Sequence, residues 1–317
     1  MTDILLTAPM PAVERGLESR FTLHRLWQAE NREAFLAQVG PRIAGLAISS
    51  SGGRLDDTLL AHLPALQIVS SFGVGYDHVD LPAVTARRLV VTNTPGVLTE
   101  EVADLTLGLL LTTLRQIPAA ERHVRAGLWP KGGFPLSPSL RGRKVGILGL
   151  GDIGLATARR LEAFGVEIAY HTRTPRSVPY AWYESPVALA GAVDVLIVLT
   201  PGGDATRHLV DTAVLTALGP DGVLINVARG SVVDTQALIE ALTNGTILSA
   251  GLDVFEDEPR VPQALIDMPH VVLLPHIGSA SMVTRAAMGQ LVVDNLVSWF
   301  DTGKPLTPIA ETRGFLA

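Results

Sequence analysis

Cysteine is absent from this chain of 317 residues. Its absence excludes disulfide bonds, cysteine nucleophiles and thiolate metal sites. The longest apolar run, LTLGLLLTTL at residues 105–114, is too short to span a bilayer and is typical of a buried helix. Residues 1–16 lack a basic segment followed by a long apolar one, so they predict a first strand and not a signal peptide. We therefore expect a cytoplasmic protein.

A strong excess of either charge is also missing. Charged residues make up 18% of the chain, and the net charge is −6. This mild acidity argues against a general affinity for nucleic acid or for an anionic membrane. There is no HExxH motif and no histidine pair at ligand spacing, so no metal site is predicted. With 47% hydrophobic residues, the chain is long enough for two domains that each have a core.

Short apolar runs alternate with helical segments in both halves of the chain. In residues 1–95 the runs ILLTAP, FTLHRL, IAGLAIS, LQIVSS and LVVTNTP predict strands. From Lys144 onward six more follow: KVGILG, VEIAY, VDVLIVL, GVLINVA, ILSAGLD and HVVLL. Such alternation is typical of βαβ units, and near-continuous apolar strands fit a parallel sheet covered on both faces.

The segments between and after these halves set the domain boundaries. One long helix is predicted from about Thr99 to Gly127, followed by an irregular stretch rich in Gly, Pro and Ser. A final amphipathic helix, residues 282–300, has room to return to the first half. The predicted fold is α/β with two doubly wound parallel-sheet domains. The first is discontinuous, residues 1–97 plus 286–317, and the second spans residues 98–285.

A glycine motif opens the second domain. Gly149, Gly151 and Gly154 in GLGDIG have GxGxxG spacing, follow an apolar strand and begin a helix that should end near Gly165. The first glycine permits the tight turn, the second lets the backbone approach a pyrophosphate, and the third lets the helix pack on the strand. A purely structural glycine turn is the alternative. The context favours dinucleotide binding, with the pyrophosphate at the helix N-terminus.

The end of the next strand lacks the acidic residue that usually binds the ribose of NAD. His171, Thr172, Arg173 and Thr174 stand there instead. Without a carboxylate a 2′-phosphate is not repelled, and these side chains offer hydrogen-bond donors to its oxygens. The motif therefore predicts NADP as the cofactor, with Arg176 as a second cation. A solvated basic loop indifferent to the 2′-phosphate is the alternative.

Three later segments bring an arginine, a glutamate and a histidine to the carboxyl ends of strands, where open α/β sheets bind ligands. They are Arg229 in NVARGSVVD, Glu258 in GLDVFEDEP and His276 in PHIGSAS. Singly, each has an ordinary structural explanation. Together they suit reduction of a 2-oxo acid: a cation for the carboxylate and carbonyl, and a histidine proton donor whose pKa a carboxylate raises.

The ordered set of motifs resembles the D-isomer-specific 2-hydroxyacid dehydrogenases over nearly the whole chain. It comprises SSFGVGYDHVD, TNTPGVLTEEVADLTLGLLL, GLGDIG, LTPGGDATRHLV, NVARGSVVDTQAL, GLDVFEDEP and PHIGSAS. Within that family, residues 171–174 and the approach GFPLSPSLRGRKVGILGLG look most like NADPH-dependent glyoxylate/hydroxypyruvate reductases. The resemblance implies a flavodoxin-like substrate domain and a Rossmann domain for NADP.

The resemblance also implies residue roles. Arg229 would bind the substrate's carboxylate and carbonyl oxygen, and the backbone amides of Val74 and Gly75 would hold the carboxylate. His276 would be the general acid in reduction and the base in oxidation, and Glu258 would be the partner of its imidazole. Asp253 would orient the nicotinamide carboxamide. Besides the glycines and residues 171–174, the implied cofactor contacts are Thr99, Leu150, Asp152, Ile153, Thr200, Pro201, Thr206, Val227, Ala228, His276 and Gly278.

A homodimer joined through the cofactor domains is implied as well, with an arm of about residues 115–140 embracing the neighbour. Trp129 or Phe134 would then reach the partner's active site or lie buried in the dimer. Two other functions stay open. Some relatives are NAD(H)-binding transcriptional corepressors, and similar scaffolds oxidise another small anion, phosphite.

Overall fold

The computed structural model describes residues 1–316. The chain divides into two compact units: residues 1–98 with 281–317, and residues 99–280. The Rossmann-type α/β class with two parallel sheets, predicted from the sequence, is confirmed. Within the described residues, no helix is long and apolar enough to cross a membrane.

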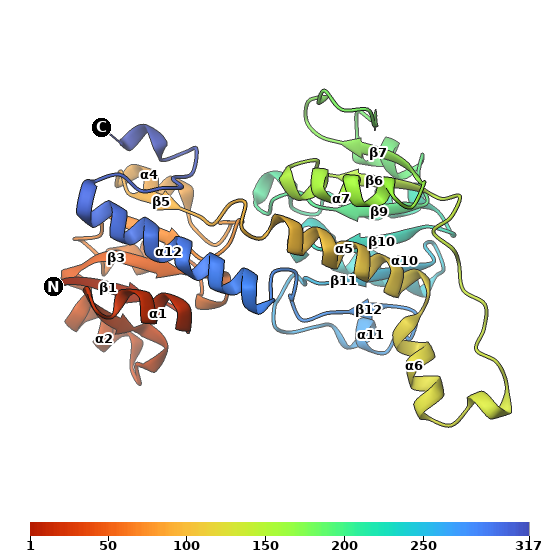
Figure 1. The fold of residues 1–317 in the computed structure, drawn as a ribbon, viewed down its shortest axis with the longest axis horizontal. Helices are drawn as coiled ribbons and strands as arrows, with labels where there is room; N and C mark the ends of the chain where they lie inside the picture. The colour runs from red at the N-terminus through yellow and green to blue at the C-terminus, as the bar shows by residue number, and fades with distance from the viewer. Residues whose placement is uncertain (317) are drawn as a thin grey trace. The chain divides into compact units, whose positions relative to one another are not determined.

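The first unit is built on a five-stranded parallel sheet in the order β2-β1-β3-β4-β5, the flavodoxin-like arrangement. Three of these strands, β1, β3 and β5, are labelled in Figure 1. The elements of this unit are β1 (Thr2–Leu6), α1 (Pro11–Leu17), β2 (Phe21–Arg25), α2 (Arg32–Val39), β3 (Ile43–Ile48), α3 (Asp57–Ala61), β4 (Ile68–Ser71), α4 (Leu81–Ala86), β5 (Val90–Thr92) and α12 (Met282–Thr302). Asn31, Asp56, Asp80 and Ser281 cap α2, α3, α4 and α12 with side-chain oxygens.

The core of this unit lies on both faces of the sheet. Ile4 and Leu6 of β1 pack in one apolar cluster with residues of α1 and α12, which lie side by side. Leu5, between them, packs on the other face with residues of α2, α3 and α4. This alternation follows from the two-residue period of a strand, and it explains why Ile4, Leu5 and Leu6 are all apolar.

The second unit has a seven-stranded parallel sheet in the order β12-β11-β10-β9-β6-β7-β8. Counted from β6, the first six strands follow the Rossmann order 3-2-1-4-5-6. Its elements are α5 (Thr99–Leu114), α6 (Ile117–Arg125), β6 (Lys144–Leu148), α7 (Asp152–Glu162), β7 (Glu167–His171), β8 (Ala181–Trp182), α8 (Pro186–Ala190), β9 (Val195–Val198), α9 (Thr212–Leu218), β10 (Val223–Asn226), α10 (Thr235–Thr243), β11 (Ser249–Leu252), α11 (Gln263–Ile266) and β12 (Val272–Leu273).

Helices cover both faces of this sheet. α5 packs against α7 and against β10 and β11, while α8, α9 and α10 contribute to a common core cluster with the strands. Arg160 of α7 is paired with Glu100 and Asp104 of α5 at 2.8 and 2.6 Å. The ion pairs and the apolar contacts both hold α7 on α5, so the helix that follows the glycine motif has a fixed position.

Two predictions of secondary structure are wrong. The single helix predicted over 99–127 is two helices, because Gln116 has a left-handed φ of 51° and Pro118 cannot continue the hydrogen bonding of α5. α6 then projects away from the sheet (Figure 1). The second half has seven strands and not six. β8 was not predicted because its two residues are exposed and leave no apolar pattern.

Candidate active site

The glycine loop connects β6 to α7, and two of its glycines are required by the fold itself. Gly149 has a φ of 99°, and a Cβ there would lie 2.8 Å from the backbone of Leu199 and Thr200. A Cβ at Gly154 would lie 2.4 Å from the carbonyl oxygen of Gly149. Larger residues at these two positions would clash with backbone, so the turn and the close packing of α7 both depend on glycine.

Gly151 is different, since a Cβ there would have no described atom within 4 Å. The chain itself therefore gives no reason for glycine at this position, whereas a ligand at the N-terminus of α7 would. Thr200, in the adjoining loop after β9, has a buried hydroxyl for which the described residues provide no partner. An open space at Gly151 and an unpaired buried hydroxyl at Thr200 fit a bound dinucleotide with its phosphates at the helix N-terminus.

The end of β7 is bound by β8 and by Tyr183, the residue that follows β8. His171 Nδ1 lies 2.8 Å from the Tyr183 carbonyl oxygen, and Trp182 Nε1 donates to the Thr172 carbonyl at 3.0 Å. Arg176 donates to the Leu150 carbonyl in the glycine loop, whereas Arg173 is exposed. The two arginines thus differ: Arg176 ties this loop to the glycine loop, and Arg173 extends into solvent.

His276 and Glu258 form a hydrogen-bonded pair, with Nδ1 2.7 Å from Oε2. Each side chain is 34% exposed, so the pair is reachable from solvent. Burial raises the pKa of Glu258, but the hydrogen bond and charge of His276, the Phe255 N–H and the charge of Arg229 outweigh it, and the pKa is lowered overall. The carboxylate is therefore ionised at neutral pH and accepts a hydrogen bond from Nδ1, which leaves Nε2 as the second ring nitrogen that can bind a proton.

Asp253 holds the segment that carries His276. Its carboxylate accepts hydrogen bonds from the Ile277 and Gly278 amides at 2.7 and 2.8 Å, and its carbonyl accepts one from the His276 amide at 2.9 Å. Burial raises the pKa of Asp253, whereas these two amides and the charge of His276 lower it. Burial has the larger effect, so the pKa is raised overall. These bonds stabilise the left-handed backbone of His276, whose φ is 52°.

Arg229 follows β10 in a loop fixed by its neighbours. Asn226 donates to the Arg229 carbonyl at 3.0 Å and accepts from the Ala228 amide at 3.1 Å, and Arg229 Nη1 donates to the Ala228 carbonyl at 2.8 Å. A Cβ at Gly230 would lie 1.8 Å from the carbonyl carbon of Phe255. Glycine thus lets the loop that carries Arg229 contact the loop that carries Glu258.

Other predicted residues of the second unit also follow the carboxyl ends of its strands. Thr200, Pro201 and Thr206 come after β9, Val227 and Ala228 after β10, and Gly278 after β12. Thr99 is the first residue of α5. In the first unit, Val74 and Gly75 lie in the loop after β4, where they are half-buried.

A cluster around Glu256 was missed by the sequence analysis. Glu256 pairs with Arg207 at 2.7 Å and with His208 Nε2 at 2.9 Å, and it accepts from the Thr235 hydroxyl at 3.1 Å. It therefore joins the loops after β9 and β11 to the first residue of α10. The acidic segment FEDEP offered no signal that would separate this structural carboxylate from its neighbours.

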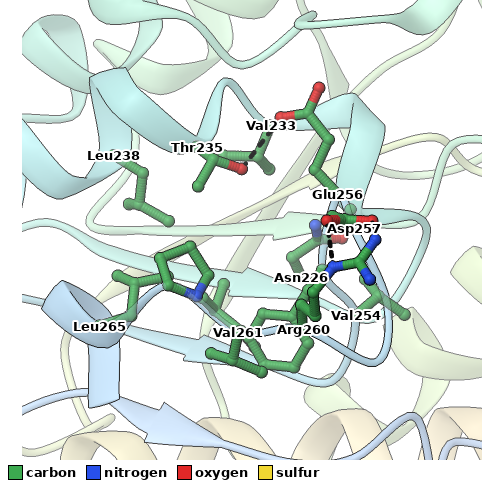
Figure 2. Close-up of a pocket in the computed structure, with 14 residues that line it drawn as sticks. Asn226, Val233, Thr235, Leu238, Val254, Glu256, Asp257, Arg260, Val261 and Leu265 are labelled. Carbon is green, nitrogen blue, oxygen red and sulfur yellow. Dashed lines mark hydrogen bonds and ion pairs between the residues drawn. The ribbon is translucent and has the colours of Figure 1, made fainter.

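A cavity of about 350 Å³ lies beside this cluster, lined mainly by apolar side chains of α10, α11 and the segment after β11. Figure 2 shows Glu256 hydrogen-bonded to Thr235 and Arg260 paired with Asp257, together with the apolar side chains of Leu238, Val261 and Leu265 that also line the cavity. Neither His276 nor Glu258 is among its lining residues. The cavity is therefore not the candidate reaction site, which contains the His276–Glu258 pair.

Comparison with known proteins places these features in a family. The model of the D-isomer specific 2-hydroxyacid dehydrogenase NAD-binding domain matches residues 107–278. Glyoxylate/hydroxypyruvate reductase A of Arabidopsis thaliana is 46% identical over 308 residues, which cover 96% of this chain and 98% of the relative. Hydroxyphenylpyruvate reductase of Plectranthus scutellarioides is also 46% identical, over 309 residues that cover 96% of this chain and 98% of the relative.

Among solved structures, the chain is similar to the NADPH-dependent glyoxylate/hydroxypyruvate reductase of Sinorhizobium meliloti in complex with NADP and malonate. The two are 56% identical with a TM-score of 0.92, and the match covers 98% of this chain and 97% of that one. Family model, sequence relatives and structure agree with the ordered motifs. This chain belongs to the D-isomer-specific 2-hydroxyacid dehydrogenase family.

Proposed function

We propose that this chain is an NADPH-dependent reductase of small 2-oxo acids, which converts glyoxylate to glycolate and hydroxypyruvate to D-glycerate. One observation carries the proposal: His276 Nδ1 lies 2.7 Å from Glu258 Oε2, in the unit that also holds the glycine loop. A histidine oriented by an ionised carboxylate is a proton donor for a carbonyl oxygen near neutral pH. The names of the Arabidopsis relative and of the S. meliloti structure support the same substrates.

The proton comes from Nε2 of the His276 imidazolium. Because the Glu258 carboxylate accepts the Nδ1 proton, it fixes the ring's orientation and stabilises the charged ring. When bound, NADPH supplies a hydride to the carbonyl carbon. Nε2 gives its proton to the carbonyl oxygen, which completes the hydroxyl group, and the neutral imidazole regains a proton from water. In the opposite direction the neutral ring acts as the base.

Substrate binding is assigned to Arg229 and to the amides of Val74 and Gly75. A guanidinium offers two parallel donors to a carboxylate and polarises the neighbouring carbonyl. Its charge is already one of the causes that lower the pKa of Glu258, which is consistent with a position near the proton donor. The first unit, with Val74 and Gly75, is thus assigned to the substrate, and the second unit to NADP.

NADPH is proposed over NADH because residues 171–174 contain no acid and Arg173 is exposed. A charge-assisted contact with the 2′-phosphate contributes about 1.5–3 kcal/mol, which corresponds to a preference of roughly ten- to a hundredfold. The remaining implied contacts, including Asp253 to the nicotinamide carboxamide, belong to the same proposal. The two Asp253 oxygens have lone pairs beyond those that accept the loop amides.

A homodimer is proposed through the arm of residues 115–140. Five large apolar side chains on α6 and the following segment are at least 41% exposed, namely Ile117, Val124, Leu128, Trp129 and Leu136. Several large apolar side chains exposed along one segment favour an interface with another protein surface. Variants at Trp129 and at Phe134 would test whether either side chain reaches the partner's active site. The cytoplasmic location stays a prediction, which cell fractionation would test.

A substrate panel tests the proposed reaction. NADPH consumption is followed by its absorbance with glyoxylate, hydroxypyruvate and hydroxyphenylpyruvate in turn, and NADP⁺ reduction is followed with phosphite. We expect turnover with glyoxylate and hydroxypyruvate. Binding of NADPH without turnover of any 2-oxo acid would instead favour a corepressor-like binding protein, and reduction of NADP⁺ with phosphite would favour a dehydrogenase of that anion.

A further inference from the structure

The loop that carries Val74 and Gly75 is held by a side chain from another strand end. Asn93, which follows β5, donates from Nδ2 to the Val74 carbonyl oxygen at 2.8 Å. The next residue, Thr94, donates its backbone amide to the Gly73 carbonyl at 3.0 Å. Two consecutive residues after β5 therefore bind two consecutive carbonyls of this loop.

The bond to Val74 fixes more than a carbonyl. The Val74 carbonyl and the Gly75 N–H belong to the same planar peptide unit, in which they point in opposite directions. When Asn93 holds the oxygen on one side, the Gly75 N–H is directed to the other side. A flip of this peptide would break the bond to Asn93, so the direction of the Gly75 N–H depends on the side-chain amide of Asn93.

Asn93 is in turn fixed by the C-terminal segment of the same unit. The Thr307 hydroxyl donates to the Asn93 backbone carbonyl at 2.6 Å, and the Asn93 backbone N–H donates to the Thr307 carbonyl at 3.3 Å. Asn295 of α12 donates to the Thr307 hydroxyl at 2.9 Å and accepts from the Leu306 and Thr307 amides, each at 2.9 Å.

Asn295 is completely buried, and these bonds satisfy its side-chain amide on both sides. A buried and fully bonded polar network has little freedom to rearrange, because each broken bond would leave an unpaired group in the interior. The network runs from Asn295 through Thr307 and Asn93 to Val74, so the substrate loop is attached to a rigid part of its unit.

We propose that Asn93 is a positioning residue for substrate binding: it directs the Gly75 N–H toward the carboxylate of the 2-oxo acid, and Thr307 holds Asn93 in place for this purpose. The inference rests on the proposed function, which assigns that carboxylate to the Val74 and Gly75 amides. A donor that is already oriented before the anion arrives binds it without the cost of reorganisation. Loss of Asn93 should therefore weaken substrate binding and leave cofactor binding intact.

The first experiment compares Asn93→Ala with Asn31→Ala. Asn31 caps α2 in the same unit through its bond to the Ala34 amide at 3.0 Å, so its loss affects stability without touching the loop. For Asn93→Ala we expect a rise of about three- to tenfold in KM for glyoxylate, the effect of one hydrogen bond, with an unchanged NADPH dissociation constant. Asn31→Ala should lower the melting temperature and leave KM unchanged.

The second experiment keeps the inference testable if Asn93→Ala does not fold. Thr307→Val removes the hydroxyl that donates to Asn93, and Thr307→Ser retains it. We expect KM for glyoxylate to rise in the Val variant and to return to the unsubstituted value in the Ser variant. Equal KM values in both variants would contradict the network's role in substrate binding.

The outcomes separate the two proposals. A normal KM in Asn93→Ala, with a melting temperature lowered as in Asn31→Ala, would show that Asn93 is structural and would overturn this inference alone. Absence of turnover in the unsubstituted protein with every 2-oxo acid would contradict the proposed function, and with it the substrate assigned to Gly75. A raised KM with normal NADPH binding supports the inference.

Discussion

The two glycine-containing loops, residues 149–154 after β6 and residues 73–76 after β4, are stabilised in different ways. In the first, Gly149 and Gly154 are required by the backbone, and the loop leads into the eleven residues of α7. In the second, the loop depends on side chains that are distant in sequence: Asn93 bonds to Val74, and Glu311 accepts from the Tyr76 hydroxyl at 3.2 Å.

This difference has a functional consequence. A pyrophosphate can be bound by a loop whose shape is set by its own glycines and by a helix N-terminus. A small 2-oxo acid has few atoms to contact, so each donor must be directed individually, and in our proposal side chains from outside the loop direct it. Variants near the first loop should therefore alter cofactor affinity, and variants near the second should alter substrate KM.

The largest effect is expected from His276→Ala, because His276 lies in neither of the two glycine-containing loops and is assigned to proton transfer. Removal of the proton donor should lower kcat for glyoxylate by about 10²- to 10⁴-fold, the usual contribution of general acid catalysis. The NADPH dissociation constant, measured by fluorescence titration, should stay within about twofold. Loss of NADPH binding would mean that His276 supports the cofactor site and is not mainly the acid.

Gly151→Val tests whether the open space in the first loop belongs to a ligand. No described atom would meet the new Cβ, so the melting temperature should hardly change. Crowding at the pyrophosphate should weaken NADPH binding by at least about tenfold, or 1.4 kcal/mol. Gly108→Val, at an exposed position of α5 with equally open space, is the control. Unchanged affinity in Gly151→Val would place the cofactor elsewhere.

Arg173→Ala and Arg176→Ala separate recognition of the 2′-phosphate from support of the glycine loop. Arg173→Ala should reduce the ratio of kcat/KM for NADPH to that for NADH by about ten- to a hundredfold. Arg176 bonds to the Leu150 carbonyl, so its loss should weaken both cofactors alike. A clear preference of the unsubstituted protein for NADH would contradict the assignment of Arg173.

The pH dependence of stability should reveal the Glu258–His276 pair. Folding lowers the pKa of Glu258 below its ordinary value of 4.5. The unfolded chain therefore binds this proton more readily, and the stability contributed by the ionised pair is present above that value and lost as the pH falls through the folded pKa. Melting curves of Glu258→Gln should show a shallower decline with acid than the unsubstituted protein. Parallel declines would argue against a native-state pKa shift.

The smallest effect is expected from Tyr76→Phe in the second loop. The Tyr76 hydroxyl donates to Glu311 at an exposed position, and the bonds of 3.2 Å are long, so their loss should raise KM for glyoxylate by less than about threefold. The effect should be smaller than that of Asn93→Ala, because Asn93 holds the peptide that contains the Gly75 donor. A larger effect in Tyr76→Phe would make Glu311 the main anchor of the loop.

The sequence predicted the parts of the fold that local pattern determines. The apolar runs gave the parallel strands, and GxGxxG spacing gave the turn between β6 and α7. β8 and the break at Gln116 were missed, because an exposed two-residue strand has no periodicity and a left-handed non-glycine residue has no compositional signal.

Much of the candidate site was also visible in sequence, since each motif combined a strand end with a chemically specific residue. The sequence motifs predicted that Glu258 is the partner of His276, and in the structure the two side chains lie at hydrogen-bonding distance. The residues that hold the Val74–Gly75 loop could not be identified from the sequence. The Asn295–Thr307–Asn93 network joins segments separated by about two hundred residues, and only the folded chain brings them together.

The most direct test is the reduction of hydroxypyruvate by the unsubstituted protein, with chiral analysis of the product and parallel rates for NADPH and NADH. We expect D-glycerate, formed with a kcat/KM at least about tenfold higher for NADPH, the effect of one arginine–phosphate contact. L-glycerate, a preference for NADH, or no reduction by a protein that binds NADPH would contradict it.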